Sequence, residues 1–196
     1  MTTVVSECVL LDLALDTFAD RGYDGTSVRD VCRRLGVSHN LVHERYGSKE
    51  ALWYAAIEHG FRHLANQLAV AAQEAQGDEL DRLRAILVRY VEVTARRPAL
   101  IRIINYEAAR PGGRLDHVYD QYIRPAHQVA DVVLQDLAAD GRARPVSPAT
   151  LHFLVGHGAG GMVSLPALAG RFPGDHGSLT DQAREAVDVV LRGIVV

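Results

Sequence analysis

The 196-residue sequence lacks the features that mark several large classes of protein. Its two cysteines, Cys8 and Cys32, are too few for a disulfide scaffold or a zinc site. No apolar run approaches the roughly 18 to 20 residues of a membrane span. The first residues also carry acids where a secretory signal begins with basic ones. We therefore expect a cytoplasmic protein with no membrane contact.

Motifs of enzymes are missing as well. The sequence contains no nucleophile elbow, no paired catalytic acids and no cofactor fingerprint. His152 and His157 are five residues apart, which is poor spacing for one face of an α-helix and differs from that of a zinc hydrolase. The glycines of residues 156 to 161 follow no strand and precede no Lys-Ser/Thr pair, so they favour close helix packing over a phosphate loop. We predict no enzyme activity, no cofactor and no metal.

Lysine is almost absent, because twenty arginines accompany the single Lys49. The net charge of −3 and the pI near 6.3 argue against binding nucleic acid by bulk attraction. The charge is unevenly placed, however. Residues 1–25 hold five acidic side chains and one basic, whereas residues 26–49 hold five basic and two acidic. A local basic surface on an acidic chain favours a protein that binds a specific DNA site.

What the sequence does contain is helical periodicity almost throughout, with no convincing alternating strand. Clusters of glycine and proline divide the pattern into segments. These signals predict an all-α protein with nine helices, at about residues 4–21, 27–34, 38–44, 48–75, 78–95, 98–109, 115–139, 147–169 and 179–194.

Residues 26–50 predict a helix-turn-helix that reads DNA. Gly36 supplies the turn between the two helices, and Cys32 supplies the small residue where they cross. Basic and polar residues alternate with apolar ones at helical spacing, which leaves an outward face suited to nucleic acid. Three candidate N-caps mark three helix starts: Thr26, Ser38 and Ser48.

The same segment resembles the N-terminal domain of TetR-type transcriptional repressors over residues 14–53. The resemblance is carried by Phe18, the Gly22-Tyr23 stop, Thr26, the Leu35-Gly36-Val37-Ser38 turn, Tyr46 and Ser48-Lys49-Glu50. It implies a helix-turn-helix DNA-binding domain at residues 1–50 and an effector-binding and dimerisation domain at residues 51–196. We expect a continuous helix, not a flexible linker, across this boundary.

The second helix of the motif should lie in the major groove of double-stranded operator DNA. His39, Asn40 and His43 are the candidates for reading base edges, and asparagine can pair with adenine through two hydrogen bonds. The family commonly has tyrosine at the position of His43, so this residue can contact phosphate, read a base or do neither. The candidates for phosphate contact are Thr26, Ser38, Tyr46 and Lys49, the last also implied by the resemblance.

One reading helix covers only a few base pairs, so we expect a homodimer on a near-palindromic site. The last two long helices are the predicted interface. Residues 151–170 are rich in Gly and Ala, which permit close helix approach. Residues 183–196 carry an apolar stripe of Ala183, Ala186, Val187, Val190, Leu191 and Ile194.

The middle helices predict a small-molecule site, because they combine apolar stripes with a few polar tips. The candidate ligand contacts are Tyr90, Asn105, Tyr106, Tyr119 and Tyr122. The alternative is that these tyrosines lie at the core margin with their hydroxyls in water. The resulting hypothesis is a repressor released from its operator by a small molecule. The alternatives are a regulator of the same fold without such an effector or controlled by a protein partner, and a helical enzyme or carrier.

Overall fold

The computed structural model describes residues 6–161, 165–173 and 177–196. This part of the chain is helical apart from its loops and a single antiparallel bridge between Ala143 and Val195, which confirms the all-α prediction. The elements are α1 (Glu7–Gly25), α2 (Val28–Leu35), α3 (His39–Tyr46), α4 (Lys49–Glu74), α5 (Glu79–Arg96), α6 (Ala99–Ala108), α7 (Gly113–Val118), the π-helix η1 (Tyr119–Ile123), α8 (Arg124–Ala139), α9 (Pro148–His152), the π-helix η2 (Phe153–Ala159), α11 (Pro166–Ala169) and α12 (Leu179–Ile194).

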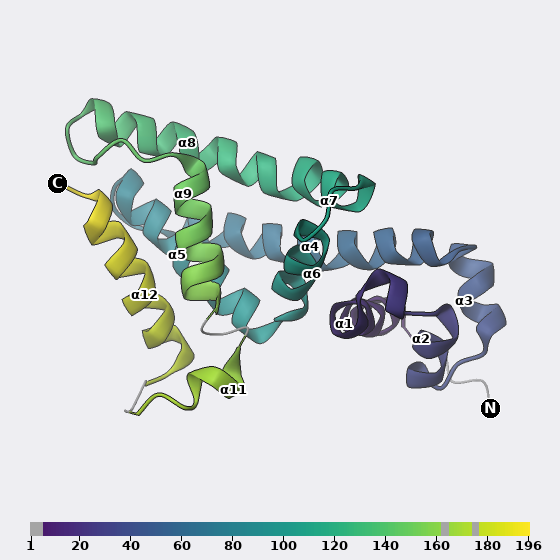
Figure 1. The fold of residues 1–196 in the computed structure, drawn as a ribbon. Helices are drawn as coiled ribbons and strands as arrows, with labels where there is room; N and C mark the ends of the chain where they lie inside the picture. The colour runs from purple at the N-terminus through teal and green to yellow at the C-terminus, as the bar shows by residue number, and fades with distance from the viewer. Residues whose placement is uncertain (1–5, 162–164, 174–176) are drawn as a thin grey trace.

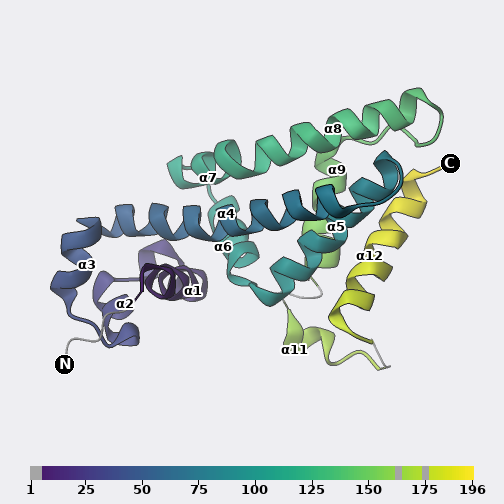
Figure 2. The same cartoon turned by 180° about the vertical axis from the view of Figure 1, so that it is seen from behind.

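The long helix α4 connects the two ends of the molecule (Figure 1). Its first half packs on α1, beside the small head formed by α1, α2 and α3, and its second half packs along α5. Figure 2 shows α8 running alongside α4 and α5, with α9 and α12 at the end far from the head. A movement of α4 can therefore reach the head without passing through a flexible linker.

Two hydrophobic clusters stabilise these parts. The first joins the head to the start of α4 and to α6, and its largest fully buried side chains include Trp53, Phe18, Leu52 and Leu100. The second joins α5, α8, α9, η2 and α12 through residues such as Leu83, Leu134, Leu151 and Val187. The start of α4 thus shares its core with the head, while α5 and α12 share theirs with α8.

The prediction of one continuous helix over residues 147–169 is wrong. The helix that begins at Pro148 passes into the π-helix η2, Leu165 is not helical, and Pro166–Ala169 form the separate short helix α11. Residues 162–164 lie outside the described residues. Four glycines between 156 and 161 weaken the regular α-helical pattern, and proline cannot continue a helix through its own missing N–H.

The apolar stripe of α12, which the sequence predicts as part of the dimer interface, is not exposed on the surface. Ala183, Val187, Leu191 and Ile194 are at most 4% exposed, because they pack within this chain's own second cluster. Ala186 and Val190 are partly buried against the same cluster. Helix α12 makes these contacts chiefly with α5 and η2. Only its opposite side remains available to a partner.

Candidate DNA-binding surface and ligand chamber

The helix-turn-helix forms from local signals. Ser27 caps α2 and makes a capping box with Asp30, and Gly36 ends the helix at φ 67° and ψ 27°, a left-handed conformation that favours glycine. Ser38 then caps α3, its Oγ accepting a hydrogen bond from the Leu41 N–H at 3.3 Å. Cys32 is buried at the crossing, and burial raises the pKa of its thiol. This cysteine is therefore a small core residue, with little thiolate at neutral pH.

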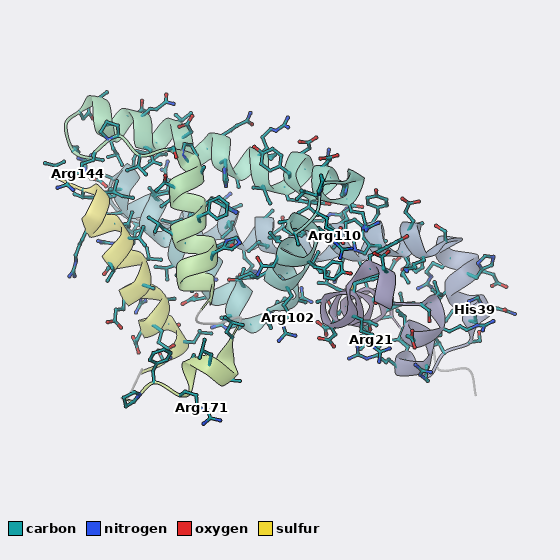
Figure 3. The ribbon with its side chains drawn as sticks, viewed as in Figure 1. Arg21, His39, Arg102, Arg110, Arg144 and Arg171 are labelled. Carbon is teal, nitrogen blue, oxygen red and sulfur yellow. The ribbon has the colours of Figure 1, made fainter. Side chains whose placement is uncertain are left out.

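The predicted base-reading residues come together on one exposed surface. His39, Asn40 and His43 all lie on α3 and are exposed. The rings of His39 and His43 stack with their centroids 6.1 Å apart, as expected for positions i and i+4. Figure 3 places His39 at the tip of the head, far from the body of the protein. This surface can approach a DNA groove without obstruction from the rest of the chain.

The prediction that Thr26 is an N-cap is wrong, and its side chain is only 3% exposed. Its hydroxyl donates to the Gly22 carbonyl oxygen at 2.8 Å and lies 3.2 Å from the Thr17 carbonyl oxygen. The neighbouring Ser27 is the cap. Thr26 therefore fixes the end of α1 against the start of α2, and its hydroxyl does not face solvent where a phosphate would lie.

Tyr46 and Lys49 lie at the rim of the head, and both are half-buried. The Tyr46 hydroxyl donates to Glu7 Oε1 at 3.3 Å, and burial together with this carboxylate raises the pKa of Tyr46. Lys49 Nζ lies 4.2 Å from the centroid of the Tyr23 ring, a cation–π contact. The phosphate contacts assigned to both residues stay predictions.

Tyr23 also connects the head to the second domain. The Arg114 guanidinium, on α7, lies 3.9 Å from the same Tyr23 ring, and its Nε donates to Glu107 Oε2 at 3.0 Å. Glu107 is only 7% exposed, and burial raises its pKa although the nearby arginine opposes this effect. One aromatic ring thus contacts a cation from the DNA-binding head and a cation from the helix that leads into α8.

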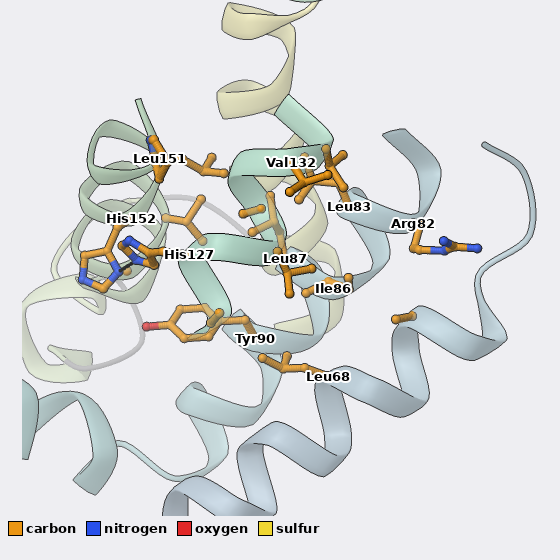
Figure 4. Close-up of a pocket in the computed structure, with 18 of the residues that line it drawn as sticks. Leu68, Arg82, Leu83, Ile86, Leu87, Tyr90, His127, Val132, Leu151 and His152 are labelled. Atoms are coloured by element: carbon orange, nitrogen blue, oxygen red, sulfur yellow. Dashed lines mark hydrogen bonds between the residues drawn. The ribbon is translucent and has the colours of Figure 1, made fainter. Parts of the chain in front are cut away.

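A chamber of about 590 Å³ lies in the second domain, between α4, α5, α8, α9 and η2 (Figure 4). This volume is in the range of small-molecule sites. Its walls are almost wholly apolar, with Leu68 from α4, Leu87 from α5 and Val133 from α8. Val129 and Val132 of α8 also line it and are 62% and 60% exposed, so the chamber is open along that helix.

Of the five residues predicted to contact a ligand, only Tyr90 lines this chamber. Asn105 and Tyr106 line a different, shallower groove beside α1, where the Tyr106 ring covers Gly22. Tyr119 is 43% exposed under the Arg124 guanidinium, and Tyr122 stacks on Phe61 with centroids 4.6 Å apart. For Tyr119 and Tyr122, the π-helix η1 changes the direction in which the side chains point relative to a regular α-helix.

Two residues that line the chamber, His127 and His152, were not among the ligand contacts predicted from the sequence. His127 Nε2 and His152 Nδ1 are 2.9 Å apart, a hydrogen bond across the two helices α8 and α9. The centroids of the His152 and His157 rings are 5.8 Å apart, although five residues separate them, because the intervening turn is π-helical. Among the described residues, no group of three or more His, Cys, Asp or Glu is placed to hold a metal ion.

The described residues therefore form a two-part helical protein, with an exposed helix-turn-helix at one end and an apolar ligand-sized chamber at the other. This is the architecture of a DNA-binding transcriptional regulator. The described helices include none that is long and apolar enough to cross a membrane.

Comparison with known proteins identifies the family of the N-terminal helices. Residues 10–56 match the family model of "Bacterial regulatory proteins, tetR family". The chain is 26% identical to the HTH-type transcriptional regulator BetI of Brucella abortus over 156 residues, which are 79% of this chain and 74% of that protein. It is 42% identical to the HTH-type transcriptional repressor Rv3405c of Mycobacterium tuberculosis over 50 residues, 26% of this chain and 27% of that protein. Residues 10–56 therefore belong to the TetR family of bacterial regulatory proteins.

Solved structures share the fold along the whole chain. The ketosteroid transcriptional regulator KstR2 of Mycobacterium tuberculosis aligns with a TM-score of 0.72 and 22% identity, covering 100% of this chain and 98% of that one. AibR, solved in complex with isovaleryl coenzyme A and operator DNA, aligns with a TM-score of 0.68 and 21% identity, covering 93% of this chain and 94% of that one. The relatives matched by sequence are transcriptional regulators, a class of protein distinct from enzymes.

Proposed function

We propose that this protein is a homodimeric repressor that leaves a palindromic operator when a small apolar molecule enters the chamber. The observation that carries the proposal is the path of α4, which begins at the DNA-binding head with Lys49 and lines the chamber with Leu68 and Ala72. A ligand that displaces the chamber end of α4 would change how the two heads are spaced. Operator and ligand would then oppose each other, typically by about 1 to 3 kcal/mol.

A second connection supports the coupling. The helical run of α7, η1 and α8 is continuous from the Arg114 contact with Tyr23 to the chamber residues His127 and Val133. Since Tyr23 also contacts Lys49, a shift of α8 would reach a predicted phosphate contact directly. AibR, with the same fold, has been solved with both a ligand and operator DNA bound. That structure is a precedent for a fold that holds a ligand and operator DNA together.

We place the boundary between the two functional domains near residue 50.

The proposed homodimer uses the outward sides of α9, η2 and α12. Phe153 and Leu154 of η2 are 60% and 47% exposed, and Val189 of α12 is 65% exposed. These apolar side chains lie on elements that contact each other, and they face away from the buried stripe described above. Exposed apolar side chains gathered on neighbouring elements are typical of protein interfaces. Two-fold symmetry would pair these elements with the same elements of a second copy.

Selection of bound duplexes from a random pool at fixed salt tests the proposed DNA-binding function. We expect one palindromic sequence to be enriched, with its half-sites about one helical turn apart. A pool without an enriched palindrome would contradict the repressor proposal. A chamber ligand that leaves operator affinity unchanged would instead support a regulator of this fold that has no small-molecule effector.

The roles assigned to the reading surface make a separate prediction. Asn40→Ala should cost about 1 to 3 kcal/mol at one base pair and relax the preference there, because it removes a base contact. Lys49→Ala should weaken binding to all sequences alike and reduce the salt dependence by about one charge, because it removes a phosphate contact. Titrations against the selected operator and its single-base variants measure both effects.

Asn66→Ala is the matched control, since Asn66 is an exposed asparagine of α4 beyond the head. It should leave affinity and sequence preference unchanged. If Lys49→Ala altered the preferred sequence while Asn40→Ala weakened all sequences equally, the two roles would have to be exchanged.

A further inference from the structure

The chamber has polar side chains at both of its ends, but only those at the inner end are placed to contact a ligand. At the outer end, Glu79 and Arg82 are exposed and pair with each other, with Arg82 Nη1 3.0 Å from Glu79 Oε1. In Figure 4 the Arg82 side chain points away from the chamber. At the inner end Tyr90, His127 and His152 lie together, and the Tyr90 hydroxyl points toward the two histidines. Any polar group of a ligand would meet these three side chains.

Tyr90 lines the chamber, and its hydroxyl is available to a ligand. Burial raises the pKa of Tyr90 to about 12, so the phenol is neutral at pH 7 and keeps its proton. Within the described part of the chain, this hydroxyl has no hydrogen-bond partner. An apolar ligand that displaced water from this hydroxyl would leave it without a partner, which costs free energy, whereas a ligand atom that accepts a hydrogen bond from it would avoid that cost.

The absence of a side chain at Gly156 leaves the space in which such an atom would lie. A Cβ atom on Gly156 would lie 3.4 Å from Tyr90 Oη and 4.0 Å from His152 Nε2. His152 uses its other ring nitrogen, Nδ1, in the hydrogen bond to His127. Tyr90 Oη and His152 Nε2 therefore both lie close to the same position. The π-helix η2 brings Gly156 and Val155 to the chamber wall beside it.

This end of the chamber is unfavourable for an ion. The lining residues here include no arginine, lysine, aspartate or glutamate, because the charged lining residues, Glu79 and Arg82, lie at the outer end. Burial lowers the pKa of His152 to about 4, with smaller contributions from His127 on α8 and His157 on η2. Together with Tyr90 on α5, these are the titratable groups near its ring. His152 is thus uncharged at pH 7, and neither a carboxylate nor an ammonium would find a counter-ion.

We infer that the chamber binds an apolar molecule that carries an uncharged oxygen, as in a ketone or an alcohol, with that oxygen between Tyr90 Oη and His152 Nε2. The Tyr90 hydroxyl donates a hydrogen bond to this oxygen. His152 donates from Nε2 to a ketone, or accepts there from an alcohol, and its tautomer follows from the direction of the His127–His152 hydrogen bond. This inference rests on the proposed function and specifies the ligand class of the same chamber.

A set of ten-carbon probes tests the inference on the full chain by calorimetry at pH 7.5. We expect 1-decanol and 2-decanone to bind at least about 10-fold more tightly than decanoate and decylamine, because the charged groups lose hydration without gaining a partner. Tyr90→Phe should weaken 1-decanol binding by about 5-fold to 10-fold, since it removes one hydrogen bond and keeps the ring. Gly156→Ala should weaken it as well, because the methyl group occupies the position between the two polar atoms.

Tyr119→Phe is the control, since Tyr119 is exposed and lies outside the chamber. It should leave the affinity for 1-decanol unchanged. Decanoate binding as tightly as 1-decanol, with an affinity that rises as the pH falls from 7.5 to 6, would show proton uptake by His152 and overturn the inference. So would a Tyr90→Phe variant of unchanged affinity, or a failure of both neutral probes to bind. Tight binding of 1-decanol without operator release would contradict the proposed function and leave the inference standing.

Discussion

Replacing Gly22 by alanine should lower the free energy of unfolding by about 3 kcal/mol, although this buried residue of α1 contacts no proposed ligand. Gly22 has φ 71° and ψ 169°, a conformation that is essentially restricted to glycine. An added Cβ would also lie 2.1 Å from the Tyr106 ring. Urea denaturation at fixed protein concentration measures the loss.

Gly36→Ala is the matched control, because Gly36 also has positive φ, at 67°, but a Cβ there would meet nothing within 4 Å. Its ψ of 27° belongs to the left-handed helical region, which alanine enters at a cost of about 1 to 2 kcal/mol. Tyr106→Ala added to Gly22→Ala should recover little stability, because the backbone conformation sets the larger cost. Equal losses for Gly22→Ala and Gly36→Ala would show that the local conformation at Gly22 is not the constraint we describe.

Disrupting the proposed dimer should reduce operator affinity by about 100-fold or more, because two linked reading heads bind far more tightly than one. Phe153→Asp with Val189→Asp places charges on the exposed sides of η2 and α12. Neither side chain is part of the buried clusters, so each subunit should stay folded. Sedimentation measures the oligomeric state, and titration of the selected operator measures the affinity.

Val70→Asp provides the control, since Val70 is a 39% exposed valine on α4, outside the proposed interface. It should leave both the dimer and the operator affinity intact. If the double variant remained dimeric with full operator affinity, the interface would have to lie on other elements. If it became monomeric and still bound the operator tightly, the requirement for two heads would be wrong.

The sequence by itself determined the DNA-binding head. The turn at Gly36, the caps at Ser38 and Ser48 and the small Cys32 all act within a few residues of their own position, so the local pattern is sufficient to specify them. The one error there, the cap at Thr26, was a shift of one residue to Ser27. Capping serines and threonines look alike in a sequence, and only the packing distinguishes the buried hydroxyl of Thr26 from the exposed one.

Only the tertiary structure decided where the chamber lies and what lines it. His127 and His152 are 25 residues apart, on helices whose contact depends on the packing of the whole second cluster. The π-helix η2 then changes the register, so His152 and His157 lie near each other at a spacing that an ideal α-helix would separate. The same packing buries the apolar stripe of α12 inside the subunit. A helical stripe specifies that a face is buried, but not which surface covers it, because that depends on residues far away in the chain.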